Sequence, residues 1–286
     1  MEKTTKSAGG SLAARRVFAY IVLILLSILC LFAFYILIVN ATRSHSEIGK
    51  GFSALPGTRM LTNLRNLMSD ANLPVFTGLR NSLLVAACSA ALSVYFSALT
   101  AYAIHCYDFK GRNIVFTFIL LIMTIPTQVT ALGFINLMDK FKMMDTFWPL
   151  ILPSVAAPAV FFFMKQYMDG ALPIEIVEAA RIDGSNEFGT FNRIVLPIMK
   201  PAFAVQAIFA FVTSWNNYFT PALILKKNNL KTLPILIAQL RSADFLKFDM
   251  GKVYMMIFLS ILPVVVVYLF LSKYIIQGVA LGSVKG

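Results

Sequence analysis

Residues 178–197 read EAARIDGSNEFGTFNRIVLP, a charged segment between two strongly apolar stretches of the chain. Four of its first ten residues are charged, and Gly184 offers a sharp turn among them. Charged side chains are costly inside a bilayer. We therefore expect this segment to lie outside the membrane, where another molecule contacts it.

The composition of the chain is that of a membrane protein. Hydrophobic residues make up 58% of the 286 residues and charged residues only 13%, and the mean hydropathy is +0.76. A soluble domain has roughly 25% charged residues. The three cysteines, Cys30, Cys88 and Cys106, all fall in apolar stretches without metal-ligand spacing, so we expect no metal site and no disulfide.

Six apolar runs are long enough to cross a bilayer, which takes about 20 helical residues. They are residues 17–40, 82–106, 114–138, 148–168, 198–225 and 253–276. The predicted fold class is therefore all-α and integral to the membrane, with six transmembrane helices. The predicted organisation is a tail (1–16, disordered over residues 1–14), a first transmembrane helix (17–40), a loop (41–79), a transmembrane core (80–276, with a charged loop at 173–197) and a second tail (277–286).

Charge alone orients the chain only weakly. The net charge is +12, but the basic residues divide almost evenly between the two sides of the predicted spans. Arg15 and Arg16, directly before the first span, favour a cytoplasmic N-terminus under the positive-inside rule. Because the basic residues are scattered rather than gathered on one face, nucleic-acid binding is a poor interpretation of this charge.

The energy source for any transport must lie outside this chain. No predicted span has an acidic or basic residue at its centre, where ion-coupled carriers commonly place one. The sequence also lacks the G-x-x-x-x-G-K-[ST] phosphate-binding loop. If ATP is the source, another polypeptide binds it.

The charged loop predicts two short helices that meet at Gly184. Pro173 suits a first helical position, and Glu175 then lies in the first turn, where the helix dipole favours an anion. Glu175, Glu178 and Arg181 recur every three residues and share a face. Ala179 and Ala180 keep the helix slim enough for close approach by a partner.

Gly184 is the expected left-handed end of the first helix. Ser185 is the expected cap of the second helix. In that helix Phe188, Phe191 and Ile194 form an apolar stripe that ends at Pro197. From the residues alone, an ordinary amphipathic interfacial loop remains an alternative.

The order Glu-Ala-Ala, Asp-Gly, Ile-x-Leu-Pro resembles the cytoplasmic coupling loop of ABC importer permeases. Further stretches are similar to maltose-type sugar importer permeases from about Asn81 to the end of the chain. They are IPTQV at 125–129, WPLILP at 148–153, WNNYFTP at 215–221, KTLP at 231–234 and GVALGSVKG at 278–286. The first 80 residues match only in outline, and Ser185 stands where the family often has Ala.

This resemblance implies a permease subunit of an ATP-driven, binding-protein-dependent importer of di- or oligosaccharides. The implied partners are a second, different permease, two ABC ATPase subunits and an external sugar-binding protein, which faces residues 226–252. ATP and Mg would lie on the ATPase, so no cofactor is expected on this chain, and no catalytic residue. The implied location is the bacterial cytoplasmic membrane, with both termini cytoplasmic and the C-terminal tail directed toward the ATPase.

The same resemblance identifies the residues expected to contact the ATPase. Glu178 would enter a cleft of the ATPase, and Gly184 would make the turn. The full predicted coupling set is Glu175, Glu178, Ala179, Ala180, Arg181, Asp183, Gly184, Ser185 and Phe188.

A second set of residues is a candidate substrate path. Amides inside a span are costly unless they are paired or hydrated, and Asn216 and Asn217 fall inside the predicted fifth span. The candidate path is Thr213, Trp215, Asn216, Asn217, Tyr218 and Thr220. We favour Asn216, because Thr213 and Thr220 extend one polar stripe with it. The aromatic residues are equally consistent with an interfacial belt, and the polar stripe with contact to the partner permease.

Two further features leave alternatives open. Pro149, Pro153 and Pro158 in the fourth span predict kinks that serve either packing or gating. His45 and His105 have no acid at useful spacing, so we assign them no role. The rival function is a secondary carrier or membrane enzyme, which would need a central acid or clustered polar residues. The sequence does not name the sugar, and glycerol phosphodiesters are a further possibility.

Overall fold

A computed structural model describes residues 5–242 and 248–282, with side chains from residue 14 to 242 and 248 to 274. Every regular element in these ranges is helical, as predicted. The chain divides into two compact units. The smaller unit holds the chain up to Asp70 and the segment that ends at Leu259, and the larger unit holds Ala71–Ser242 and the segment that begins at Ser260.

The smaller unit is organised around the end of its long helix. Its elements are α1 (Thr5–Ala41), α2 (His45–Gly49), α3 (Met60–Met68) and the first turns of α15 (Met250–Gly282). The Asn63 amide donates to the carbonyls of Ala41 and Arg43 at 2.9 and 2.8 Å. A Cβ on Gly251 would lie 2.7 Å from the Asn63 side-chain oxygen, so this glycine lets α15 begin against α3.

The larger unit is a bundle in which α4 (Val75–Cys106) packs chiefly against α8 (Pro158–Ala171) and α12 (Lys200–Trp215). Small side chains on α4, among them Ala98 and Ala101, are fully buried and allow this close packing. The core continues through Met164, Phe191 and Met199. The other elements are α5 (Arg112–Ile122), α6 (Thr127–Lys140), α7 (Trp148–Ile151), η1 (Leu152–Val155), α9 (Ile174–Ile182), α10 (Glu187–Thr190), η2 (Phe191–Val195), α11 (Leu196–Ile198), α13 (Phe219–Ile224), η3 (Asn228–Leu230) and α14 (Leu233–Arg241).

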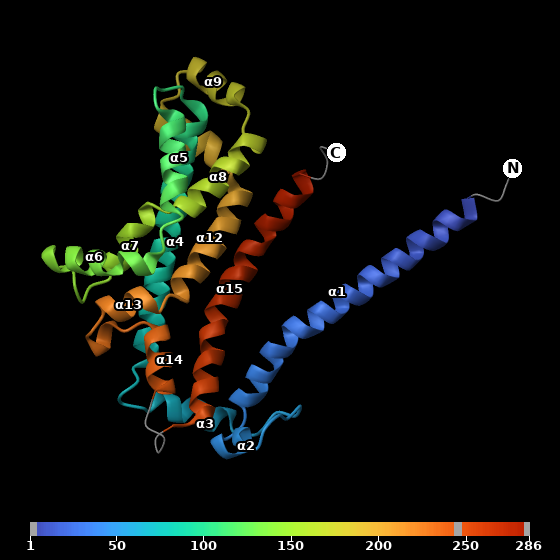
Figure 1. Ribbon diagram of the computed structural model, residues 1–286, viewed down its shortest axis with the longest axis vertical. Coiled ribbons are helices and arrows are strands. Elements are labelled where there is room, and N and C mark those ends of the chain that lie inside the picture. Colours follow the sequence, from blue (N-terminus) through green and yellow to red (C-terminus); the bar gives the residue numbers. More distant parts are fainter. Residues whose placement is uncertain (1–4, 243–247, 283–286) are drawn as a thin grey trace. The chain divides into compact units, whose positions relative to one another are not determined.

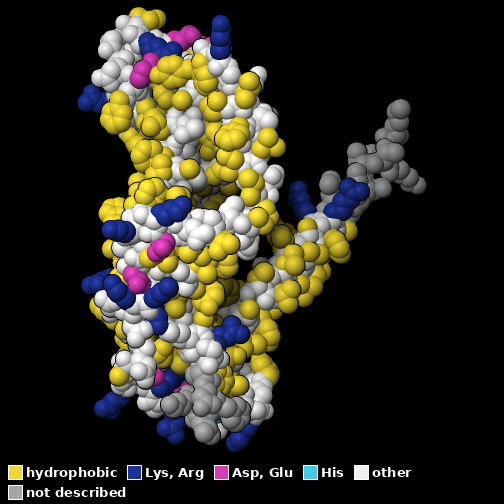
Figure 2. All heavy atoms as spheres, turned by 60° about the vertical axis from the view of Figure 1, so that its left-hand side comes forward, with side chains coloured by type: hydrophobic (Ala, Val, Ile, Leu, Met, Phe, Trp, Pro, Cys, Tyr) yellow, Lys and Arg dark blue, Asp and Glu magenta, His cyan; other side chains and the backbone are white. Residues whose placement is uncertain are grey.

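Helix α9 lies at one end of this bundle and α14 at the other (Figure 1). Figure 2 shows acidic and basic side chains at the end that carries α9, a surface dominated by hydrophobic side chains next to it, and further charged side chains beyond that surface. At the opposite end, Gly78 lets α4 approach α14, since a Cβ there would lie 2.4 Å from Leu236.

By length and hydropathy, four of the described helices can span a membrane, or up to six elements if each of two bent pairs counts as one span. The four are 14–41, 75–106, 148–171 and 250–274. These correspond to the predicted first, second, fourth and sixth spans. The predicted third and fifth spans are the two bent pairs.

The third span is not the single helix over 114–138 that the apolar run predicts. Helices α5 and α6 meet at 97°. Pro126 caps α6 in an extended conformation, and a proline disfavours helical geometry in the residue before it. The apolar pattern did not reveal this break because both arms are hydrophobic.

The fourth span is interrupted, and its prolines stand where its pieces begin. It runs through α7, the short 3-10 helix η1 and α8, and Pro149, Pro153 and Pro158 each stand in the first turn of one of these pieces. Each proline lacks the backbone donor that a continuous helix would require. The structure gives the place of each kink, and the choice between packing and gating stays a prediction.

The fifth span, predicted over 198–225, begins next to a bend, as the charged segment before it suggests, but ends earlier than predicted. The segment 187–198 meets α12 at 83°, and α12 ends at Trp215. Asn216 caps this end and Asn217 lies in the connection to α13. These amides therefore occupy a helix break, not the helix interior that the sequence suggested.

Helical structure extends into both predicted tails. Helix α1 begins at Thr5, within the predicted disordered tail. Helix α15 runs through Pro263 and continues to Gly282, through the start of the predicted tail at 277. The remainder of the C-terminal motif, residues 283–286, lies outside the described residues, as do residues 243–247 of the segment predicted to face a binding protein.

Candidate coupling site and candidate substrate path

The loop after the fourth span forms two short helices, as predicted. Pro173 caps α9 rather than standing inside it, Glu175 lies in the first turn, and Arg181 in the last. Val177 and Ala180 are buried, whereas Glu175 and Glu178 are exposed. One face of α9 therefore packs on its own chain, and its acidic face is open to solvent.

Gly184 makes the turn between the two helices. Its φ of +79° is left-handed, a conformation that glycine adopts without steric cost. The Ser185 amide donates to the Ala180 carbonyl and the Gly184 amide to the Arg181 carbonyl, both at 3.0 Å. These two bonds are those of a Schellman motif. They satisfy carbonyl groups at the end of α9 and fix the conformation of the turn.

The cap of the second helix is Asn186, not Ser185. The Asn186 side chain accepts a hydrogen bond of 2.7 Å from the Gly189 amide. Both residue types cap helices, and the register of the turn decides between them. Ser185 instead accepts a bond from the Thr190 hydroxyl at 2.9 Å.

Helix α10 does not continue as a regular α-helix. Phe191–Val195 form a π-helix, η2, an arrangement that is often found at functional sites. Phe191 and Val195 are fully buried in the core, while Phe188 is 68% exposed. The predicted stripe is therefore divided between the core and the surface. Pro197 stands in the first turn of α11 and does not end the element.

An ion pair joins the two short helices. Arg181 Nε donates to Glu187 Oε1 at 2.8 Å, and the guanidinium lies 5.1 Å from the centre of the Tyr107 ring. Hydrogen bonding to Glu187 raises the pKa of Arg181. Arg181 was predicted to share a face with Glu178, but its partner is Glu187, six residues onward in the chain.

The same carboxylate anchors this segment to the membrane span α4. The Tyr102 hydroxyl donates to Glu187 Oε2 at 2.9 Å. In the π-helix η2, the Asn192 side chain accepts a second hydrogen bond from α4, donated by the Tyr95 hydroxyl at 3.2 Å. Sequence reasoning missed both tyrosines, because their partners lie 85 and 97 residues away.

His105 has a role that sequence spacing did not reveal. Its Nδ1 lies 2.9 Å from Asp169 Oδ1, and its Nε2 lies 2.9 Å from the Leu172 carbonyl oxygen. Lys165 binds the same Asp169 carboxylate. The expectation that no acid accompanies His105 is therefore wrong. These contacts hold the end of α8 against α4, directly before α9 begins.

The exposed part of the coupling segment combines acid and apolar side chains. Glu178 and Ala179 are exposed, Ile182 is 87% exposed, and Phe188 and Asp183 are exposed nearby. A short helix with an acidic face and projecting apolar side chains suits insertion into a cleft of a second protein. Ala180 is only 4% exposed, so its small side chain permits packing within this chain.

The predicted substrate-path residues do not form one surface. Trp215 is 3% exposed, stacks on Phe211 at 5.6 Å and donates to the Ser260 carbonyl at 3.1 Å. Its ring is therefore occupied by the protein and does not form a sugar-stacking platform here. Tyr218 is 49% exposed and belongs with Asn216 to a pocket of about 400 Å³.

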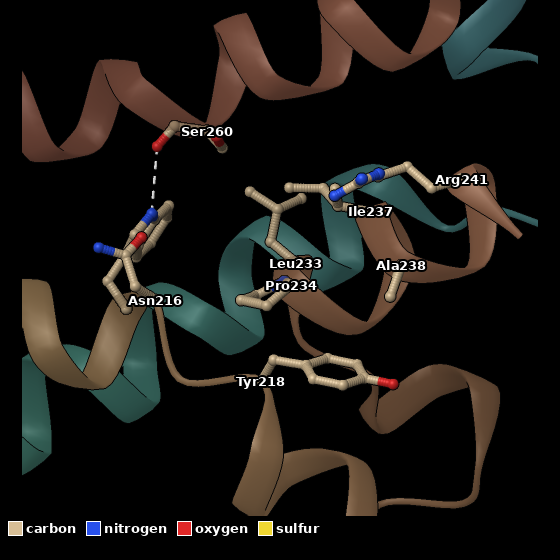
Figure 3. A pocket seen from close by; sticks show the side chains of 9 residues that line it. Asn216, Tyr218, Leu233, Pro234, Ile237, Ala238, Arg241 and Ser260 are labelled. Atoms are coloured by element: carbon tan, nitrogen blue, oxygen red, sulfur yellow. Dashed lines mark hydrogen bonds between the residues drawn. The ribbon is translucent and has the colours of Figure 1, made fainter.

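Asn216 and Asn217 line different cavities. In the pocket that Asn216 lines, Asn216 and Arg241 lie on opposite sides (Figure 3), so its polar groups do not converge. Asn217 lines a cavity of about 720 Å³ together with Thr213, and a neighbouring one of about 670 Å³ with Thr220. The stripe predicted for Asn216 with Thr213 and Thr220 is therefore wrong, because the helix ends before it reaches Thr220.

The cavity of about 720 Å³ lies within the larger unit, among α4, the proline-rich start of α8, and α12. Ser93 and Gln206 line it, and sequence reasoning missed both. A signal was present, since Gln206 is the single amide in the run AFAVQAIFAF, residues 202–211.

The fold and these sites define a multi-pass membrane protein with an exposed docking segment at one end. Residues 93–280 match the family described as binding-protein-dependent transport system inner membrane component. The chain belongs to this family. It is a transport component, which favours the importer interpretation over a secondary carrier or a membrane enzyme.

Relatives extend over nearly the whole chain. The arabinooligosaccharides transport system permease protein of Bacillus subtilis is 35% identical, covering 92% of this chain and 93% of that one. The lactose transport system permease protein of Rhizobium radiobacter is 29% identical over 93% and 95% of the two chains. The sn-glycerol-3-phosphate transport system permease protein of Pectobacterium atrosepticum is 29% identical over 92% and 95%.

A solved structure shares the fold. It is the crystal structure of a bacterial ABC transporter involved in the import of the acidic polysaccharide alginate. The superposition has a TM-score of 0.75 at 22% identity and covers 91% of this chain and 97% of that one. The broken spans described above thus belong to a fold that is found in a membrane transporter.

Proposed function

We propose that this chain is one of two different permease subunits of an ATP-driven importer of di- or oligosaccharides. Two ABC ATPase subunits bind ATP and Mg and dock on the permeases, and an external binding protein delivers the sugar. The complex lies in the bacterial cytoplasmic membrane, and both termini of this chain are cytoplasmic.

One observation carries the proposal. Two short helices lie at a charged end of the apolar bundle, and a hydrogen-bonded turn at Gly184 joins them. Of the predicted coupling set, Glu175, Glu178, Ala179, Asp183, Gly184 and Phe188 are exposed, whereas Ala180 is buried. The half-buried Glu187 attaches the segment to α4 through Tyr102. A push on α9 therefore reaches a membrane span through hydrogen-bonded contacts.

The mechanism that fits this arrangement is alternating access. ATP binding closes the paired ATPases and moves the coupling segment, and the spans rearrange so that the cavity opens outward. Hydrolysis returns the cavity to the inward-facing state. The bends at Pro126 and Met199 give two spans separate arms, which suits rearrangement because packed helices move as rigid pieces.

A carbohydrate is the substrate class that the relatives support. Two of the relatives are named as transport proteins for a sugar, and a third is named as a transport protein for sn-glycerol 3-phosphate. The specific sugar depends on the external binding protein as well as on this chain.

The test is uptake by proteoliposomes that contain the assembled transporter, meaning this chain, its partner permease, the ATPase and the binding protein. Neutral oligosaccharides, acidic oligosaccharides and glycerol phosphodiesters are offered together, and mass spectrometry identifies what enters the lumen. ATP-dependent entry of sugar supports the proposal. Entry of no cargo, or equal entry without ATP, would contradict it.

A further inference from the structure

The cavity of about 720 Å³ in the larger unit contains polar side chains whose hydrogen bonding is incomplete. On α12 and the connection after it, Gln206, Thr213 and Asn217 line the cavity. Ser89 and Ser93 line it from one face of α4, four residues apart. Typical ligand sites have about 300–1,000 Å³ and a few polar groups in an apolar lining, and this cavity has both properties.

Gln206 is the more deeply buried of the two amides that line this cavity. It is 7% exposed on an otherwise apolar stretch of α12. Its amide makes no hydrogen bond within the part of the chain that the structure describes. A buried amide without partners destabilises the fold. An amide that lines a cavity avoids this cost by binding water or a ligand there.

Ser93 differs from the serines on either side of it. Ser89 donates to the Leu150 carbonyl and Ser97 to the Ala157 carbonyl, each at 3.3 Å. Ser93 lies between them on the same face of α4 and is 3% exposed. Among residues 5–242 and 248–282 its hydroxyl has no hydrogen-bond partner. Two serines therefore bind the interrupted fourth span, and the middle one is left for the cavity.

Asn217 supplies a third group at the end of α12. Its side-chain oxygen accepts a bond of 3.3 Å from the Thr220 amide, which fixes the side chain and leaves the amide NH₂ as a donor. Gln206, Ser93 and Asn217 therefore bring both donors and acceptors to the cavity. Hydroxyl groups, which also donate and accept, match this mixture.

The charge of the lining narrows the ligand class. Among the described residues that line this cavity, none is Asp, Glu, Lys, Arg or His. A buried ionic group without a counter-charge is strongly disfavoured. The walls include Phe163 and Phe209, which suit the apolar faces of sugar rings. The lining thus fits a neutral polyhydroxylated ligand and not a phosphorylated or acidic one.

We propose that Gln206, Ser93 and Asn217 form a hydrogen-bonding subsite for a neutral sugar in the translocation path. This inference rests on the proposed function and adds residues and a charge class to it. Gln206 binds hydroxyl groups from α12 and Ser93 binds them from α4, and Asn217 binds them from the connection after α12.

The experiment compares Gln206→Leu and Ser93→Ala with the matched control Ser97→Ala in the assembled transporter. Loss of one hydrogen bond to the cargo should lower uptake about tenfold below saturation. Basal ATPase activity is measured in both variants and in Ser97→Ala, as a check that the complex still assembles. Ser97→Ala should transport at the wild-type rate, because its hydroxyl bonds to the protein.

The readouts separate failure of the subsite from failure of the function. Wild-type uptake of neutral sugar with unchanged uptake by Gln206→Leu and Ser93→Ala would overturn the subsite. Wild-type uptake of acidic or phosphorylated cargo alone would overturn the neutral class. Absence of any ATP-dependent uptake by the wild type would instead contradict the proposed function. Impaired basal ATPase activity in Gln206→Leu would show that Gln206 has a structural role. Sugar uptake by Ser93→Ala would then decide whether the subsite exists.

Discussion

The Tyr102 hydroxyl donates a hydrogen bond of 2.9 Å to the Glu187 carboxylate, which joins the membrane span α4 to the first residue of α10. The same carboxylate binds Arg181 at the end of α9. Glu187 is therefore the point at which both short helices and a membrane span meet. This contact gives movement of the coupling segment a direct route to α4.

Tyr102→Phe should uncouple ATP hydrolysis from transport. The change removes one hydrogen bond to a charged group, worth about 1.5–3 kcal/mol, and leaves the ring packing on Phe191 in place. We expect less sugar taken up per ATP hydrolysed, measured in proteoliposomes. Tyr95→Phe removes a bond to the neutral Asn192 amide and should have a smaller effect. An unchanged ratio in Tyr102→Phe would show that this contact does not carry the motion.

Gly184→Val should lower transport while the protein still inserts into membranes. Gly184 has φ +79° and no atom within 4 Å of an added Cβ, so the cost is backbone strain alone, about 1–2 kcal/mol. Gly184→Asn should be tolerated better, because asparagine visits this conformation. Gly170→Ala, where an added Cβ also meets nothing within 4 Å, is the control. Full transport by Gly184→Val would refute the role of the turn.

The purified chain, free of ATPase subunits, should not bind or hydrolyse ATP. The reason is the missing phosphate-binding loop in the sequence. Equilibrium binding of a fluorescent ATP analogue to the chain in detergent gives the measurement, and the assembled complex gives the positive control. Saturable, ATP-competed binding to the chain alone would contradict the assignment of ATP to a partner.

The turn that holds Asp145 should loosen in acid. Asp145 accepts hydrogen bonds from the Lys226 and Lys227 amides at 2.6 and 3.1 Å, and these bonds lower its pKa. Its contribution to stability is therefore present above the ordinary aspartate pKa of about 3.9 and is lost as the pH falls through the lowered folded-state pKa.

Hydrogen exchange read by mass spectrometry between about pH 3 and 6, across the ordinary aspartate pKa, measures this effect. The protection factor of the peptide that contains Lys226 and Lys227 should fall toward the acid end. In Asp145→Ala the protection should be low throughout, without the acid step. A flat protection factor in the wild type would contradict the prediction.

Thiol labelling at position 217, rather than at position 216, should respond to cargo in the cavity of about 720 Å³. In a variant without Cys30, Cys88 and Cys106, a cysteine at position 217 should react with a water-soluble thiol reagent more slowly when cargo and binding protein are present. A cysteine at position 216 should react at a rate that cargo does not change, because the two side chains line different cavities. Slower reaction with cargo at position 216 and not at position 217 would contradict this prediction and support the polar stripe that the sequence suggested.

The sequence by itself determined the class of this protein. Long apolar runs without central charges require helices that cross a bilayer, since only internally bonded backbone is stable there. The order of charges and glycine at 178–197 was sufficient to predict two short helices outside the membrane, because helix ends and left-handed glycines depend on local chemistry. These features need no knowledge of distant contacts.

Tertiary structure decided where the spans break and which side chains meet. Both arms of the bend at Pro126 are hydrophobic, so the apolar pattern is silent about it, whereas the charged segment before Met199 did mark the start of the fifth span. The pairs Tyr102–Glu187 and His105–Asp169 join residues 85 and 64 positions apart, and no local pattern encodes such separations. Likewise Ser89, Ser93 and Ser97 are alike in sequence, and only the packing of the interrupted fourth span against α4 satisfies two of them and leaves Ser93 for the cavity.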